Sequence, residues 1–362
     1  MDTPQPSLVN ASCPLPLREH ERIVLGHGAG GKLTAQLIND VFLPAFRNPV
    51  LERMDDQAVL ALPAATTGQG AGRLALTTDS FVITPIFFPG GDIGSLAVHG
   101  TVNDLAMGGA KPLWLAAAFI LEEGLARTDL ARVVHSMAAA AEQAGVTIVT
   151  GDTKVVNHGK GDQVFITTTG VGWVPEGVSL GANRAQPGDV VLLSGTIGDH
   201  GMAILSLREN LEFETTIASD SAALHTLAAA LLAACPPPAL RCMRDPTRGG
   251  VATSLHEIAL RSGVGVQLDE SAIPVRESVS SACELLGIDP LYVANEGKLV
   301  AIVSSDYASR ALATLKQHPL GADACRIGEI IASPKDMVLL QTSVGGTRVL
   351  DTHFHEQLPR IC

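Results

Sequence analysis

Apolar and polar positions along the chain follow two alternating periods, which predict a succession of strands and helices. Short runs rich in Val, Ile and Thr are typical of strands, whereas longer apolar stretches closed by glycine are typical of helices. Strands are expected at 73–83, 113–121, 146–156, 163–174, 190–194, 264–268, 297–303, 326–331 and 337–341. Helices are expected at 93–107, 199–207, 221–234, 250–261, 276–286 and from an N-cap at Thr128 to 144.

This alternation occurs twice, on either side of a stretch that contains proline and glycine, NRAQPGD at 183–189. A chain of 362 residues is also long enough for two domains of ordinary size. The pattern belongs to the α/β or α+β class and does not choose among topologies. We expect four parts, namely a proline-rich extension at 1–21, an N-terminal domain at 22–182, a C-terminal domain at 183–350 and a tail at 351–362.

The composition excludes several classes of protein. Apolar residues make up 46% of the chain and charged residues 17%, which is typical of a folded protein with a sizeable core. Aromatic residues are only 4% and the net charge is −12, which argues against a nucleic-acid binder. No apolar run approaches the roughly 20 residues that a bilayer requires. The first residues lack a secretory pattern, so we expect a cytoplasmic protein without membrane segments.

A glycine-rich stretch, GHGAGGK at 26–32, satisfies two phosphate-binding patterns loosely. The P-loop pattern needs Ser or Thr after the lysine, and Leu33 stands there. Backbone amides alone can still approach a phosphate, which makes Gly30, Gly31 and Lys32 candidate nucleotide contacts. A plain glycine turn before a helix is equally consistent with this stretch.

A set of acidic and amide residues stands at the ends of predicted strands and in one predicted helix: Asp56, Asp79, Asn103, Asp104 and Asp152. Each of them alone is consistent with a turn or a cap. Together they are the oxygen ligands that magnesium prefers when it accompanies a nucleoside triphosphate. Because acids beside apolar strands are costly unless used, the set favours a magnesium–nucleotide site.

Three further residues are candidates for phosphate or proton chemistry. Arg248 lies in DPTRGG, which opens a predicted helix, and a helix N-terminus with an arginine suits an anion. Glu296 lies in NEG between predicted strands and is either a catalytic acid–base or a turn residue. Lys154 follows Asp152 by two, so both point to one face of a strand, for phosphate contact, proton transfer or a salt bridge.

The chain has six cysteines, none in a CxxC pair and none near a zinc-like histidine cluster. Five of them are consistent with small apolar fillers. The sixth, Cys362, is the last residue of the chain and follows Pro359-Arg360-Ile361.

The stretches GHGAGGKLT, TTDSFV, HGTVNDLAMGGAKP, GDTKVV, DPTRGG, NEG and the terminal PRIC occur in that order. Together they resemble the HypE family of hydrogenase maturation factors. That family belongs to the superfamily of aminoimidazole ribonucleotide (AIR) synthetase, selenophosphate synthetase and thiamine-monophosphate kinase. The resemblance runs from about Ile23 to Cys362, and the PRIC end is what points to HypE within the superfamily.

The resemblance implies an activity and partners. A carbamoyl group would be loaded onto Cys362 by the carbamoyltransferase HypF and dehydrated with ATP to a thiocyanate. The cyanide would then pass to iron on a HypC–HypD complex, for a nickel–iron hydrogenase. Magnesium–ATP would be held by Asp56, Asp79, Asn103, Asp104 and Asp152, the four aspartates being the metal ligands. Lys154 and Glu296 would assist deprotonation of the carbamoyl nitrogen.

The implied fold is the two-domain AIR synthetase-like α/β (α+β) fold. Its N-terminal sheets would form a barrel in a homodimer, with ATP near the dimer interface, a C-terminal α/β sandwich and a mobile tail that carries Cys362. Two other functions stay open from the residues. One is a superfamily kinase or synthetase that acts on a free small molecule, and the other is a non-enzymatic maturation scaffold whose tail docks partners.

Overall fold

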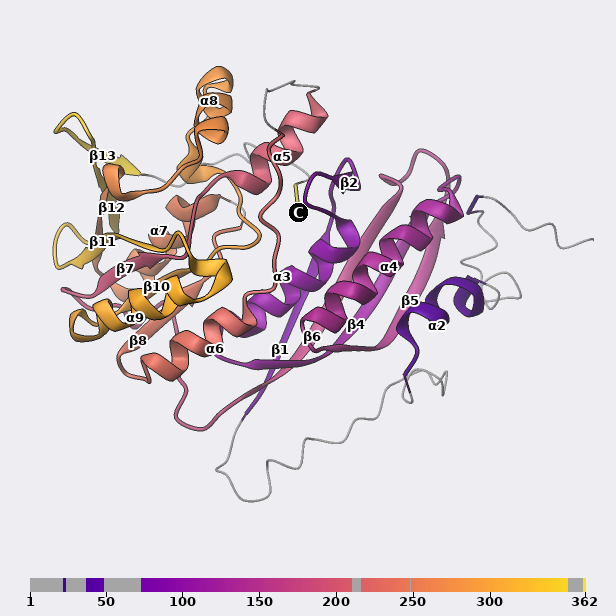
Figure 1. Cartoon of the computed structure of the whole chain (residues 1–362), viewed down its shortest axis with the longest axis horizontal. Helices are drawn as coiled ribbons and strands as arrows, with labels where there is room; N and C mark the ends of the chain where they lie inside the picture. The colour runs from indigo at the N-terminus through magenta and orange to yellow at the C-terminus, as the bar shows by residue number, and fades with distance from the viewer. Residues whose placement is uncertain (1–21, 24–36, 49–72, 210–215, 248, 351–360) are drawn as a thin grey trace, which may run out of the picture.

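The computed structural model describes residues 22–23, 37–48, 73–209, 216–247, 249–350 and 361–362. Within these ranges the chain forms two principal sheets with helices packed against them (Figure 1). The smaller elements are the π-helix η2 (Ile38–Phe42), α2 (Leu43–Phe46), the pair β2 (Phe87–Phe88) and β3 (Gly91–Asp92), and the 3-10 helices η5 (Glu270–Ala272), η6 (Pro290–Tyr292) and η7 (Pro319–Gly321).

The first sheet has four strands in the order β1-β6-β4-β5, and two helices cover one of its faces (Figure 1). Only β4 and β5 are parallel, and α4 connects them in the usual crossover. The elements are β1 (Arg73–Phe81), α3 (Ile93–Met107), β4 (Lys111–Glu122), α4 (Arg127–Gln143), β5 (Thr147–Val156) and β6 (Val164–Val174).

The prediction of Thr128 as the N-cap of α4 was wrong. The cap is Ala126, which has no capping side chain, and its carbonyl accepts from the amides of Asp129 and Leu130. Ala126 is extended because it bridges Arg22, so this pairing and not a hydroxyl sets the start of the helix. At the other end Gly145 has a φ of 65°, which is the left-handed turn expected of it.

The second sheet has seven strands in the order β13-β12-β9-β11-β7-β10-β8. It is antiparallel apart from the β12–β9 pair. The elements are β7 (Val190–Leu193), α5 (Asp199–Arg208), α6 (His225–Ala234), β8 (Leu240–Arg244), α7 (Gly250–Ser262), β9 (Gly265–Asp269), α8 (Glu277–Leu286), β10 (Val300–Val303), α9 (Ser305–Gln317), β11 (Cys325–Ile331), β12 (Met337–Gln341) and β13 (Thr347–Leu350).

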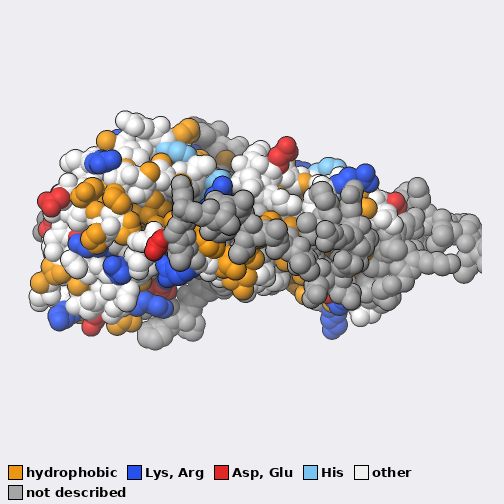
Figure 2. All heavy atoms as spheres, turned by 90° about the horizontal axis from the view of Figure 1, so that it is seen from below, with side chains coloured by type: hydrophobic (Ala, Val, Ile, Leu, Met, Phe, Trp, Pro, Cys, Tyr) orange, Lys and Arg blue, Asp and Glu red, His pale blue; other side chains and the backbone are white. Residues whose placement is uncertain are grey.

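Both faces of the second sheet are covered, because alternate residues of its strands enter different cores. Val191 and Leu193 of β7 pack with α7, whereas Val190 and Leu192 pack with α6 and α9. This explains why β7 and β10 are buried throughout. On the face shown in Figure 2, hydrophobic side chains of this half reach the surface among Lys and Arg side chains.

Helix α3 lies between the two sheets and belongs to both of their cores (Figure 1). Its first turns share a core with α5 and α8, and its last residues, Ala106 and Met107, pack with α6. Its start is fixed by Asp92, whose carboxylate accepts from the amides of Gly94 and Ser95. Among the helices of the described ranges, none is long and apolar enough to cross a membrane.

Candidate functional site

Helix α3 carries two of the predicted site residues to the junction of the sheets. Asp104 accepts a hydrogen bond of 2.8 Å from the hydroxyl of Thr77 on β1. Asp79 lies two residues along the same strand and on the same face, toward α3. The strand and the helix approach closely there because residue 100 is glycine, where a Cβ would lie 2.9 Å from the ring of Phe81.

Asn103 is buried and fastens the loop that carries Glu296. Its amide nitrogen donates to the carbonyls of Ala222 and Glu296, at 3.0 and 3.3 Å, and its amide oxygen accepts from Leu224 at 2.7 Å. Both donor hydrogens and the acceptor therefore serve the protein itself. Asn103 therefore holds two segments of the second half against α3.

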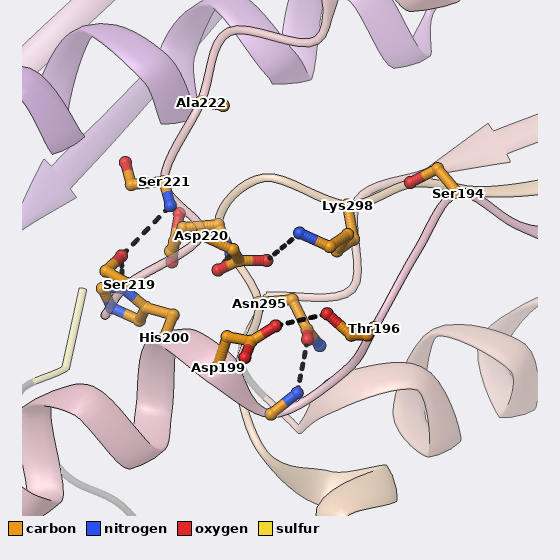
Figure 3. A network of polar contacts seen from close by, with 12 residues as sticks. Ser194, Thr196, Asp199, His200, Ser219, Asp220, Ser221, Ala222, Asn295 and Lys298 are labelled. Carbon is orange, nitrogen blue, oxygen red and sulfur yellow. Dashed lines mark hydrogen bonds and ion pairs between the residues drawn. The ribbon is translucent and has the colours of Figure 1, made fainter. Parts of the chain in front are cut away.

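Glu296 is 2% exposed, and its Oε1 atom has no hydrogen-bond partner among the described residues. Its backbone amide donates to the carboxylate of Asp220 at 3.1 Å, and the other oxygen of that carboxylate pairs with Lys298 at 3.1 Å (Figure 3). The next residue, Gly297, leaves room for this loop, because a Cβ there would lie 1.7 Å from the carbonyl oxygen of Asp220. The NEG motif thus supplies the carboxyl group of Glu296 and the glycine that lets its loop pack against Asp220.

The neighbouring Asn295 ties three segments together. Its amide oxygen accepts from Gly198 at 2.8 Å, and its amide nitrogen donates to the carbonyls of Pro246 and Val293, both at 3.0 Å. Because Asn295 directly precedes Glu296, these bonds fix the start of α5 and the loop after β8 beside the segment that carries Glu296.

The carboxyl groups at this junction hold their protons unusually firmly. Burial, and then the charge of Asp245, raises the pKa of Glu296 well above its ordinary value. Burial, followed by repulsion from Asp104, raises the pKa of Asp245 to about 7. The pKa of Asp104 is also raised, mainly by burial, although the Thr77 hydroxyl opposes this. Such a cluster can donate or accept a proton near neutral pH, and it favours the arrival of a cation.

Asp152 and Lys154 do not join this cluster within one chain. They lie on β5, at the opposite edge of the first sheet from β1, and side by side with Ala118 and Ile120 on the uncovered face. The two side chains form an exposed ion pair of 3.0 Å. The Lys154 ammonium, and then the Thr153 amide, lowers the pKa of Asp152.

The end of the chain docks at the same junction. The side chain of Ile361 is 3% exposed, and its backbone bridges Ile83, just beyond β1. The amide of Val82 donates to the carbonyl of Cys362 at 3.0 Å. Val82 follows Asp79 by three residues, or about 10 Å of extended strand, so the predicted carrier residue lies close to the acidic cluster.

Five predicted nucleotide contacts lie outside the described residues, namely Gly30, Gly31, Lys32, Asp56 and Arg248. In the part of the chain that the structure describes, no three His, Cys, Asp or Glu side chains group closely enough to form a metal site of their own. Sequence reasoning missed Asp220, Lys298 and His200. Each of them stands in a stretch without a motif and acquires its partners only through tertiary contacts.

Comparison with known proteins gives a consistent result over nearly the whole chain. Family models of AIR synthase related proteins match in two blocks, the N-terminal domain at 54–174 and the C-terminal domain at 186–341. Carbamoyl dehydratase HypE of Cupriavidus necator is 60% identical over 341 residues, which cover 94% of this chain and 95% of the relative. The protein of the same name from Azotobacter vinelandii is 59% identical over 336 residues, which cover 93% and 96%.

Solved structures agree with these relatives. HypE in complex with ATP matches with a TM-score of 0.87 and 48% identity, over 94% of this chain and 99% of that one. A chain of the HypE–HypF complex matches with a TM-score of 0.75 and 51% identity, over 88% and 99%. Thiamine-monophosphate kinase from Stenotrophomonas maltophilia, at 23% identity, 80% and 89% coverage and a TM-score of 0.60, shares the fold.

Proposed function

The chain belongs to the HypE carbamoyl dehydratases of the AIR synthase related superfamily, and from this we propose that it dehydrates a carbamoyl group carried on its own Cys362. ATP drives the reaction, and the product is an S-cyano group that supplies cyanide for hydrogenase maturation. The single observation that carries the assignment to this chain's residues is the docking of Cys362 just beyond the end of β1, the strand that carries Asp79.

The chemistry balances as a phosphoryl transfer followed by an elimination. The carbamoyl oxygen attacks the γ-phosphorus of ATP, so ADP leaves and an O-phosphorylated imidate forms on the Cys362 sulfur. The C–O bond then breaks, phosphate carries the oxygen away, and the nitrogen loses both of its hydrogens as protons. The protein must therefore hold two substrates in line and accept protons at the nitrogen.

Glu296 suits the role of the group that accepts such a proton. It is buried at the junction and has one oxygen without a protein partner. Burial and then the neighbouring acids raise its pKa, so both disfavour its charged form. A magnesium–nucleotide complex that partly neutralises those acids would lower this pKa and leave Glu296 able to act as a base.

Magnesium fits the acids that the structure brings together. This ion commonly binds one or two protein carboxylates, with substrate phosphates and water completing its shell. Asp79 and Asp104 would supply these carboxylates, so a third protein ligand is not required. Asp56 is the further candidate from the sequence, and the phosphates would contact Gly30, Gly31, Lys32 and Arg248. The ion would neutralise phosphate charge during the transfer.

A homodimer would explain the uncovered face of the first sheet and the position of Asp152 and Lys154. That face exposes Leu74 and Leu76 of β1, at 57% and 73%, and Ile120 of β4, at 40%. Large apolar side chains exposed on one sheet face are typical of an interface. We propose that a second copy covers them and completes a barrel, with ATP near the interface, and that Asp152 and Lys154 serve the second copy's site.

The remaining assignments extend from the family. HypF is proposed as the enzyme that loads Cys362, because a chain of a HypE–HypF complex shares 51% identity with this one. A HypC–HypD complex is proposed as the acceptor of the cyanide, in the cytoplasm. We also propose 22–182 and 183–350 as the two domains, followed by a carrier tail at 351–362, of which 351–360 lie outside the described residues.

Mass spectrometry of the C-terminal peptide tests the proposal. The protein is incubated with HypF, carbamoyl phosphate and ATP, and then digested. We expect the peptide to gain a carbamoyl group and, only with hydrolysable ATP, to lose one water. Cys362→Ala should bind ATP normally and show neither change. A carbamoylated peptide that never loses water would refute the dehydratase assignment and favour a docking scaffold. ATP turnover that survives removal of the last three residues would favour a small-molecule kinase.

A further inference from the structure

His200, near the start of α5, is fully buried and uses both ring nitrogens. Its Nε2 atom lies 2.5 Å from the carbonyl oxygen of Ile361, and its Nδ1 atom lies 2.7 Å from the hydroxyl of Ser219. The ring also packs edge-on against Phe88, with 5.7 Å between the ring centroids. The side chain therefore joins the last two residues of the chain to a loop of the second half.

These contacts define one proton arrangement. A carbonyl oxygen can only accept, so Nε2 carries the hydrogen that it donates to Ile361. In the neutral ring Nδ1 then accepts from the Ser219 hydroxyl, whose oxygen accepts in turn from the amide of Ser221 at 3.1 Å (Figure 3). Every donor in this chain has an acceptor. Burial lowers the pKa of His200, which agrees with the neutral ring.

The loop that orients His200 also contacts the segment that carries Glu296, the proposed base. The consecutive side chains of Ser219, Asp220 and Ser221 contact three different segments. Ser219 bonds His200 and Asp220 pairs with Lys298 (Figure 3). Asp220 also accepts from the Glu296 amide, and the Ser221 hydroxyl lies 2.9 Å from Nδ1 of His99 on α3. A displacement of Ser219 would therefore be transmitted over one residue to the contact that fixes Glu296.

We propose that His200 is a positioning residue that fastens the docked C-terminus, and that the Ser219–Ser221 loop couples this docking to the placement of Glu296. The inference rests on the proposed dehydration at Cys362. Its physical basis is that the bond from His200 is one of the contacts that hold the chain end, beside the buried side chain of Ile361, the packing of Cys362 against the core and the Val82–Cys362 backbone bond. Loss of the His200 bond leaves a buried carbonyl oxygen without its donor, which should lower the docked population.

The test compares His200→Leu with His200→Gln. Leucine keeps the volume and the packing against Phe88 but leaves the Ile361 carbonyl unpaired. Glutamine can still donate at a similar reach. An unpaired buried acceptor shifts a docking equilibrium by roughly ten-fold or more, so alkylation of Cys362 by iodoacetamide without ATP should be about ten-fold faster in His200→Leu. His200→Gln should stay within about two-fold of the wild type by the same reasoning. Labelling is read on the C-terminal peptide, which separates Cys362 from the other cysteines.

The rate of water loss from the carbamoylated peptide is the second readout. It should fall in His200→Leu and recover in His200→Gln, with unchanged affinity for ATP. Ser219→Ala, which keeps the imidazole but releases its orientation, should show both effects to a smaller degree and covers the case that His200→Leu fails to fold. His318→Gln changes a histidine remote from the tail and serves as the control.

The outcomes separate the two proposals. If the wild-type protein dehydrates its tail, and His200→Leu and Ser219→Ala label and react at wild-type rates, the positioning role is wrong and the function stands. If the variants label faster but the wild-type protein never loses water, the docking contact stands and the function is wrong. Loss of activity in both His200→Leu and His200→Gln with unchanged labelling would also overturn the positioning role.

Discussion

Gly297→Ala should disrupt the site through a single methyl group. The added Cβ would lie 1.7 Å from the carbonyl oxygen of Asp220 and 3.1 Å from the amide nitrogen of Ala222. Both are backbone atoms, so no rotamer change relieves the contact. Gly297 does not have a left-handed conformation, so the effect is steric and does not arise from backbone strain.

The size of the effect follows from what the Asp220 loop must do. Its carbonyl oxygen has to move by about 1.3 Å to reach the 3.0 Å that real Cβ contacts tolerate. This shift would loosen the Asp220–Lys298 ion pair and the Asp220–Glu296 hydrogen bond. Overpacking typically costs about 1–3 kcal/mol, and loss of a buried ion-pair partner about 3–5 kcal/mol, so we expect at least about 3 kcal/mol of destabilisation.

Thermal unfolding and the dehydration assay measure the two consequences. A loss of this size should lower the Tm by roughly 5–10 °C, and water loss from the carbamoylated tail should become undetectable or nearly so. Gly108→Ala is the matched control, because its added Cβ would lie at ordinary contact distances, 3.5 Å from the carbonyl oxygen of Leu105 and 4.0 Å from that of Asp104. The steric argument would be refuted if Gly297→Ala had the same Tm as Gly108→Ala and dehydrated the carbamoylated tail at the wild-type rate.

Three further predictions concern the acids and the exposed sheet face. Asp245 keeps its proton up to about pH 7 in the folded protein but loses it near 3.8 when unfolded, so stability without nucleotide should fall as the pH rises between these values. Asp245→Asn should flatten that fall, as urea midpoints across the range would show, and an unchanged slope would contradict the assignment. Asp79→Ala should raise the dissociation constant of magnesium–ATP by about ten-fold or more, because it removes one strong charge-assisted contact. Calorimetry measures this affinity. Equal affinity would remove it from the site. Leu76→Lys should shift the protein toward the monomer in sedimentation, whereas Leu285→Lys on α8, a similarly exposed leucine, should not.

Local periodicity was sufficient to predict the helices and strands that consist mainly of apolar residues. The expected helix at 93–107 matches α3, and the expected strands at 190–194 and 337–341 match β7 and β12 within one residue. Helix α9 was missed although its period is present, since Ala311 and Leu315 are four apart and buried. The short strands β8 and β13 were missed as well, because arginines interrupt their apolar positions, whereas the equally short β7 is apolar throughout.

Tertiary contacts decided several boundaries. Helix α6 was expected from 221 and begins at His225. Residues before it are held out of the helix because Leu224 donates to Asn103 and Ala222 donates to the Glu296 carbonyl. Bonds to distant segments outweighed the helical preference of this sequence.

The sequence by itself was sufficient to single out candidate residues for the proposed site. Asp79, Asn103, Asp104 and Glu296 were singled out by their small-residue contexts and do meet at one junction. The family resemblance extended that set to Cys362. Sequence spacing could not show that Asp152 and Lys154 lie on the opposite face and edge of the sheet, because that depends on strand order.

Only the tertiary structure decided how these residues are used. The proton affinity of Glu296 depends on burial and on four acids contributed by other segments, and none of these distances is encoded locally. His200, Ser219 and Asp220 became visible only when the fold brought the chain end beside α5. A pattern of residue types records which side chains can react or hydrogen-bond. Their partners are set by packing between segments as far apart in the chain as Val82 and Cys362.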